Sequence, residues 1–323
     1  MAARFDLYYG EPGTAKSRSV IELIKRFCEK NPEKIARVYI GDGSRGMYEE
    51  SGLVDKGKIK IFEFALRDEP FSTCQQMCEG FWPSDENNPW SKLRKLTPAE
   101  VAETGLWVFE GASVMGQYMM GDKPGGLAYR SGQGNETIGQ DTPIRFVDKE
   151  SGMIFGGNPG AHYNVAQRHL HSDILRTKAF PGWVIWTAHE RMDDGERGGS
   201  FSKSGGNEKT KLGEKLIGPE LVGKALTSNI SRDFGNTLHF TIAGKKKQDG
   251  IDPITGKTNY IETQEYRVYT RDHYDPDGIV GLKYRAINRS MNPDMIKDYY
   301  VGEKPGEALL QFYSDLEKSK LKG

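Results

Sequence analysis

The stretch Gly10-Glu11-Pro12-Gly13-Thr14-Ala15-Lys16-Ser17 (GEPGTAKS) decides the fold of this chain. An apolar run at residues 5–9 precedes it and an amphipathic segment at residues 17–29 follows it, so we expect a buried strand, a loop and a helix. Its spacing matches the phosphate-binding loop GxxxxGK[ST], except that Ala15 replaces the last glycine. Glycines let successive N–H groups point at phosphate oxygens, and the helix N-terminus adds partial positive charge. The stretch therefore predicts a nucleotide-phosphate site.

The roles within this loop follow from side-chain chemistry. We expect Lys16 to reach the β- and γ-phosphates and the Ser17 hydroxyl to bind Mg²⁺. The residues predicted to bind the nucleotide are Gly10, Glu11, Pro12, Gly13, Thr14, Ala15, Lys16, Ser17 and Arg18. ATP and Mg²⁺ are the predicted cofactors, and the sequence does not distinguish ATP from GTP. A chance Gly-Pro-Gly turn before a helix is the alternative interpretation.

The rest of the chain alternates between strand-like and helix-like segments. Nearly continuous apolar runs, typical of strands covered on both faces, occur at residues 36–40, 105–110 and 182–188. Residues 58–66 form a further strand-like run, and helical patterns occupy 164–178 and 219–230. Three late strand-like runs follow at 237–243, 263–270 and 280–286. This order predicts an α/β fold with a mostly parallel central sheet flanked by helices, carrying an antiparallel C-terminal extension and long loop insertions.

We divide the chain accordingly. Residues 1–290 are predicted to form one ATPase-like domain, with an insertion loop and hairpin at 120–163 and a mobile loop at 191–217. The Lys245-Lys246-Lys247 run is placed in the turn of a late hairpin. Residues 291–323 are predicted to form a C-terminal helical tail.

The amino-acid composition limits the cellular location and the kinds of partner that we expect. The chain has 323 residues with 45 basic and 45 acidic side chains, so attraction to nucleic acid must come from local patches. Three cysteines do not make a disulfide framework, which favours reduced thiols in an intracellular protein. No run approaches the roughly 18 apolar residues that span a bilayer. We therefore expect a cytoplasmic protein with no membrane partner.

Polar residues close three of the predicted strands. Glu110 ends one strand and is the candidate Mg²⁺ carboxylate, although a strand-end glutamate facing solvent is the alternative. Asp42 ends another and is a candidate general base; an Asx-turn is the alternative role. His189 ends a third and could sense the γ-phosphate, or could be a structural histidine. Carboxyl ends of parallel strands share one sheet edge, so these side chains should meet the phosphate loop.

With the loop at 10–17, the acid-ended strand at 106–110 and the strand end at 187–190, the chain resembles the RecA/Rad51-like ATPase core. It is most similar in outline to phage-type nucleotide-binding proteins associated with recombination and annealing. The resemblance implies a ring or filament of identical subunits, and a phage protein would act inside a bacterial host. It implies a basic residue donated in trans, for which Arg271 is the candidate and Lys283 and Arg285 are alternatives.

The same resemblance implies contact with DNA, expected to be single-stranded, through residues 120–163 and 191–217. Both segments combine arginines or lysines with aromatic residues, the mixture that single-strand binding uses. Solvated loops of mixed charge are the alternative. The resulting hypothesis is a Mg²⁺-dependent ATPase that handles DNA in recombination or replication. A viral DNA-packaging or other translocating motor shares the same residues, and Ala15 and Glu110 leave open a nucleotide-binding regulatory protein with little turnover.

Overall fold

A computed structural model describes residues 4–86, 88–120, 146–147, 154–155, 159–193, 215–221, 230–251, 258–274, 282–288 and 292–321, and all structural statements concern these. Eight strands form the main run of the large sheet, in the order β3-β2-β6-β9-β1-β11-β12-β16. Their bounds are β1 Arg4–Gly10, β2 Ile35–Ile40, β3 Ile59–Glu63, β6 Thr104–Glu110, β9 Trp183–Asp193, β11 Asn236–Ile251, β12 Thr258–Tyr269 and β16 Tyr299–Gly302. The pairings from β3 to β11 are parallel, and β12 and β16 extend the sheet by antiparallel pairings. The predicted fold class is confirmed.

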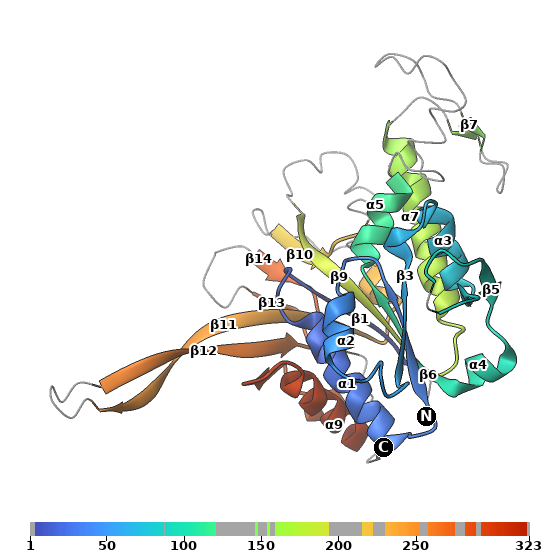
Figure 1. The fold of residues 1–323 in the computed structure, drawn as a ribbon. Coiled ribbons are helices and arrows are strands. Elements are labelled where there is room, and N and C mark those ends of the chain that lie inside the picture. The colour runs from blue at the N-terminus through green and yellow to red at the C-terminus, as the bar shows by residue number, and fades with distance from the viewer. Residues whose placement is uncertain are drawn as a thin grey trace.

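Helices cover both faces of this sheet, which explains why its central strands are apolar throughout. Every residue of β2 and of β6 is buried. One face carries α1 (Lys16–Lys30), α2 (Arg45–Glu50) and α9 (Glu307–Leu321); the other carries α3 (Pro70–Cys78), α5 (Ala112–Met120) and α7 (Pro159–Thr177). The chain therefore has three layers (Figure 1). The short α4 (Pro98–Glu103) begins at a capping box between Thr97 and Glu100, as its sequence pattern indicates.

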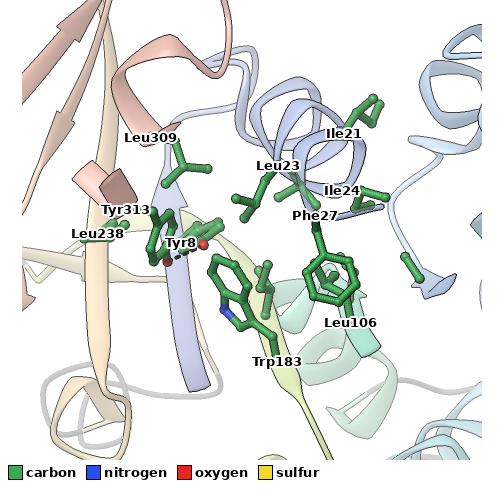
Figure 2. Packing of buried hydrophobic residues seen from close by; sticks show 14 of the residues in the cluster. Tyr8, Ile21, Leu23, Ile24, Phe27, Leu106, Trp183, Leu238, Leu309 and Tyr313 are labelled. Carbon is green, nitrogen blue, oxygen red and sulfur yellow. Dashed lines mark hydrogen bonds between the residues drawn. The ribbon is translucent and has the colours of Figure 1, made fainter. Parts of the chain in front are cut away.

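The last helix packs on the same core as the first one. Figure 2 shows Leu309 and Tyr313 of α9 beside Tyr8 of β1 and Trp183 of β9. The Tyr313 hydroxyl donates to Asp6 at 2.8 Å and contacts the Tyr8 hydroxyl at 2.6 Å. Strand β16 pairs with β12. Within the predicted tail, residues 292–321 thus supply a sheet strand and part of the core.

Strands β11 and β12 are much longer than the predicted 237–243 and 263–270. They continue to Ile251 and begin at Thr258, and they form a two-stranded arm that projects far from the body (Figure 1). The arm, which we define as residues 242–251 and 258–266, includes the three lysines predicted to occupy a turn. The prediction failed because glycine and lysine have low strand propensity. The hydrogen bonds that pair β11 with β12 are made by the backbone, so they form despite these side chains.

Smaller elements complete the fold. Strand β9 continues to Asp193 and pairs antiparallel with β10, so both ends of the predicted 191–217 loop are strand. Within the predicted 120–163 insertion, β7 pairs antiparallel with β8. The helix predicted from residue 219 does not begin there, because Pro219 ends β10; residues 222–229 lie outside the described part. The remaining bounds are β4 Phe81–Pro83, β5 Leu93–Lys95, β7 Phe146–Val147, β8 Ile154–Phe155, β10 Lys215–Pro219, β13 His273–Tyr274, β14 Leu282–Tyr284, β15 Ile287–Asn288, η1 Phe64–Leu66, η3 Ile230–Arg232 and η4 Pro293–Met295.

Candidate nucleotide site at the carboxyl edge of the sheet

The phosphate loop joins β1, which ends at Gly10, to α1, which begins at Lys16. Gly10 lies against the next strand: a Cβ at this position would be 2.3 Å from the Phe240 carbonyl oxygen, so only glycine fits. Gly13 has a φ of +86°, which side chains rarely tolerate. The Thr14 hydroxyl donates to the Glu11 carbonyl at 2.8 Å and closes the loop. The strand, loop and helix predicted from residues 10–17 are all present.

Ala15 holds the loop in a conformation that its sequence does not favour. Its φ is 61° and its ψ is 26°, in the left-handed region, and no other non-glycine residue among those described has a positive φ. Glycine adopts this conformation without steric cost, whereas alanine places its Cβ against the following carbonyl oxygen. The alanine thus occupies the backbone geometry that would suit a glycine, at an energetic cost.

Lys16 is buried in the loop, with 8% of its surface exposed. Its Nζ donates to the Gly10 carbonyl at 2.9 Å and to the Glu11 carbonyl at 2.8 Å. Burial lowers the pKa of this ammonium, and the negative charges of Glu110, Asp42 and Glu190 act in the opposite direction. These carboxylates belong to neighbouring strands: Glu110 ends β6, Asp42 follows β2, and Glu190 lies within β9. His189, predicted to end its strand, is likewise an interior residue of β9, which continues to Asp193.

Glu110 ends β6, and β9 lies between it and the phosphate-loop strand. It is buried, so the solvent-facing alternative is excluded. The Tyr48 hydroxyl donates to one carboxylate oxygen and the Thr187 hydroxyl to the other, each at 2.5 Å. Burial raises the pKa of Glu110 to about 7, the charge of Asp42 adds to this rise, and both hydroxyls and Lys16 oppose it. Two donors from other elements, neither of them part of a motif, therefore hold the carboxyl in a fixed position.

Asp42 and His189 line the same pocket as the phosphate loop. Asp42 Oδ1 accepts the Ser44 N–H at 3.2 Å, which is the Asx-turn alternative, so Asp42 has a turn role as well as a place in the pocket wall. The backbone N–H of His189 donates to the Ser113 hydroxyl at 2.9 Å. Its Nδ1 is buried and has no hydrogen-bond partner among the described residues. A buried, unpaired ring nitrogen costs free energy and often marks a functional position.

The pocket has a volume of about 470 Å³, within the range of small-molecule sites. One wall is the phosphate loop with Ser17 and Arg18, and a second wall carries Asp42 and His189. The third wall is Ile242, Gln264 and Tyr266 at the root of the arm. Sequence reasoning missed this wall because the arm comes from strands far along the chain and has no motif.

A second polar group beside the phosphate loop is the pair formed by Glu190 and His239. Glu190 Oε2 lies 3.0 Å from Nε2 of the buried His239, whose pKa burial lowers to about 3. The imidazole is therefore neutral, and the pKa of Glu190 is raised by burial and lowered by Lys16 and by the backbone N–H of Glu11. Glu190 thereby connects the first turn of the phosphate loop to β11. The strand end at 187–190 marked this region, but no pattern identified His239 as its partner.

A magnesium site built from Ser17 and Glu110 has the oxygen donors that this ion prefers. Ser17 is in the pocket wall, whereas Glu110 is not among the lining residues and is 1% exposed. The arrangement fits a carboxylate that acts on the ion through an intervening water better than one that binds it directly. Among the described residues no group of three or more His, Cys, Asp or Glu side chains could hold a metal by itself.

Arg271 is not brought to the pocket of its own chain. It follows β12 at the end away from the arm, is 45% exposed on its side chain, and pairs with Asp298 at 2.9 Å. Its role in trans remains a prediction. Of the two segments predicted to contact DNA, residues 121–145, 148–153, 156–158 and 194–214 lie outside the described part. In the described part, no helix is long and apolar enough to cross a membrane. The three cysteines are buried free thiols.

Comparisons with known proteins add little to this geometry. No protein-family model and no curated protein matches the chain. One solved structure similar to it is the flagellar accessory protein FlaH from Methanocaldococcus jannaschii, with a TM-score of 0.42 and 9% sequence identity, covering 94% of this chain and 87% of that one. A TM-score below 0.5 is too low to carry a conclusion about function.

Proposed function

We propose that the protein is a Mg²⁺-dependent ATPase of RecA-like type that couples ATP binding and hydrolysis to DNA handling as an oligomer. The observation that carries the nucleotide part is the setting of Lys16. A buried ammonium at the start of α1, in a loop shaped by Gly10 and Gly13, lines a pocket of nucleotide size. The negative charges of nearby carboxylates, Glu110 and Asp42 first among them, oppose the lowering of its pKa by burial. Helix N-termini and inward N–H groups favour phosphate at this place.

The proposed reaction is in-line attack of water on the γ-phosphate. Lys16 and the loop N–H groups would hold the phosphates, and the Ser17 hydroxyl with Glu110 behind it would hold the ion that neutralises their charge. Asp42 in the pocket wall would orient the water. The unpaired Nδ1 of His189 would form a hydrogen bond when the γ-phosphate is present and so sense it. When bound, Mg²⁺ would supply electrostatic stabilisation of charge on the transferred group.

Two observations support slow ATP hydrolysis. Ala15 strains the loop, and both oxygens of Glu110 are engaged by hydroxyls. A nucleotide-binding regulatory protein with little turnover is therefore the second candidate. A DNA-packaging motor would use the same residues.

The experiment compares ATP hydrolysis by the wild type and Lys16→Ala, with and without single-stranded DNA at one fixed salt concentration. Lys16-dependent turnover that single-stranded DNA stimulates is expected. ATP binding without turnover would favour the regulatory candidate, and Lys16-dependent turnover without DNA binding at low salt would remove the DNA part. Absence of both binding and turnover would contradict the whole proposal.

A further inference from the structure

The arm contributes an uncovered apolar pair to the nucleotide pocket. Ile242 and Tyr266 face each other across β11 and β12, directly beyond the pair formed by Phe240 and Val268. Phe240 and Val268 are buried in the core, whereas Ile242 and Tyr266 are half-buried and line the pocket. The four residues share one face of the sheet. The apolar face that packs against the core therefore extends by one more residue pair, Ile242 and Tyr266, into the arm. This last pair lines the pocket and is not covered by core residues.

One glycine of the arm keeps the space beside this pair open. Tyr266 also pairs with Gly302 of β16, where a Cβ would lie 2.6 Å from the Glu307 Cβ, so the start of α9 closes that side. The next residue along the same face is Gln264, whose partner across the arm is Gly244. A Cβ at Gly244 would meet nothing within 4 Å. The tyrosine ring and the glutamine amide are thus presented together beside free space.

A hydrogen bond links the amide of Gln264 to the tyrosine. The Tyr266 hydroxyl donates to Gln264 Oε1 at 3.0 Å, which uses one of the two lone pairs of that oxygen. The oxygen can accept a second hydrogen bond, and the amide nitrogen carries two N–H donors. A flat aromatic ring beside an amide is the chemistry that recognises a nucleobase, by stacking and by paired hydrogen bonds.

We propose that Ile242 and Tyr266 bind the base of the nucleotide and that Gln264 gives a preference for adenine over guanine; this rests on the proposed nucleotide binding. A glutamine amide can accept from the adenine N6 amino group and donate to N7. Guanine presents two acceptors at that edge, O6 and N7, so the amide oxygen would face an acceptor. The phosphate loop and this wall belong to one pocket, and pairing of β1 with β11 sets their relative positions.

The test measures equilibrium binding of ATP, GTP and inorganic tripolyphosphate, each with Mg²⁺, by calorimetry. The variants are Tyr266→Ala, Tyr266→Phe, Gln264→Leu and Lys16→Ala; Tyr274→Ala is the matched control, because Tyr274 is an exposed tyrosine of β13 outside the pocket. Tyr266→Ala should weaken ATP binding about tenfold or more and leave tripolyphosphate binding unchanged. Tyr266→Phe should keep ATP affinity within about twofold, since the ring remains.

Gln264→Leu should reduce the preference for ATP over GTP to roughly one. Equal ATP affinities of the wild type and Tyr266→Ala, or a preference unaltered by Gln264→Leu, would overturn the base site while Lys16-dependent binding kept the phosphate site. An equal loss of tripolyphosphate binding in Tyr266→Ala would also overturn it, because the tyrosine would then support the loop and not the base. If the wild type bound neither ATP, GTP nor tripolyphosphate, both proposals would be overturned.

Discussion

Replacement of Ala15 by glycine should stabilise the protein, which is unusual for a change that removes a side chain from a loop. Alanine in the left-handed region costs roughly 1–2 kcal/mol, and the φ of 61° places Ala15 within that region. Glycine loses more freedom on folding, which offsets about 0.5–1 kcal/mol of the gain. The side chain is only partly buried, so its removal forfeits little packing. The expected net change is a free energy of unfolding higher by about 0.5–1 kcal/mol.

The assay is urea unfolding of the wild type, Ala15→Gly and a matched control, Ala102→Gly. Ala102 is exposed within α4, where the same replacement should lower the free energy of unfolding by about 1 kcal/mol. The two variants should therefore shift the midpoint in opposite directions with unchanged slopes. Loss of stability in Ala15→Gly comparable with that in Ala102→Gly would refute the left-handed assignment. Retained ATP affinity in Ala15→Gly would further show that alanine and glycine give the loop one conformation.

Three further outcomes follow from the buried polar groups. Glu110→Gln should keep ATP binding and reduce Mg²⁺-dependent hydrolysis by about 10- to 100-fold, the usual effect of a residue behind a metal; turnover equal to that of the wild type would remove Glu110 from the site. Because burial raises the pKa of Glu110 from 4.5 to about 7, its stabilising contribution is complete below pH 4.5 and is lost as the pH rises through 7. Without Mg²⁺ the wild type should lose up to about 3 kcal/mol relative to Glu110→Gln over that window, and a constant difference between the two urea midpoints would contradict the shift. Tyr313→Phe removes a donor from the buried Asp6 and should cost about 1–3 kcal/mol, whereas Tyr299→Phe, at an exposed position, should change the midpoint little.

The parts of the site that follow from local sequence were predictable. Residues 10–17 specify a strand, a loop and a helix through nearest-neighbour chemistry alone, and apolar runs specify strands such as β2 and β6. The parallel sheet places Asp42 and His189 in the wall of the pocket beside the phosphate loop, and Glu110 at the end of β6. These predictions needed periodicity and turn chemistry only.

The parts that depend on distant pairing were not predictable from one sequence. The donors Tyr48 and Thr187 reach Glu110 from two other elements, and neither belongs to a motif. The arm was underestimated because Lys245 and its neighbours have low strand propensity, and only pairing with β12 makes them a strand. The role of β16 and α9 in the core was missed for the same reason, since their partners lie far away in the chain.

The position of β1 in the sheet has a consequence for the order of assembly. This strand contains the first described residues, yet its partners are residues 183–189 of β9 and residues 236–239 of β11. During synthesis it must therefore wait, unpaired, until β9 and β11 have been made. Pairings of such long range are slow to form because loop-closure entropy must be paid first. The phosphate loop is made before the strands that flank it and gains its geometry only after they have paired, so nucleotide binding would report completion of this sheet.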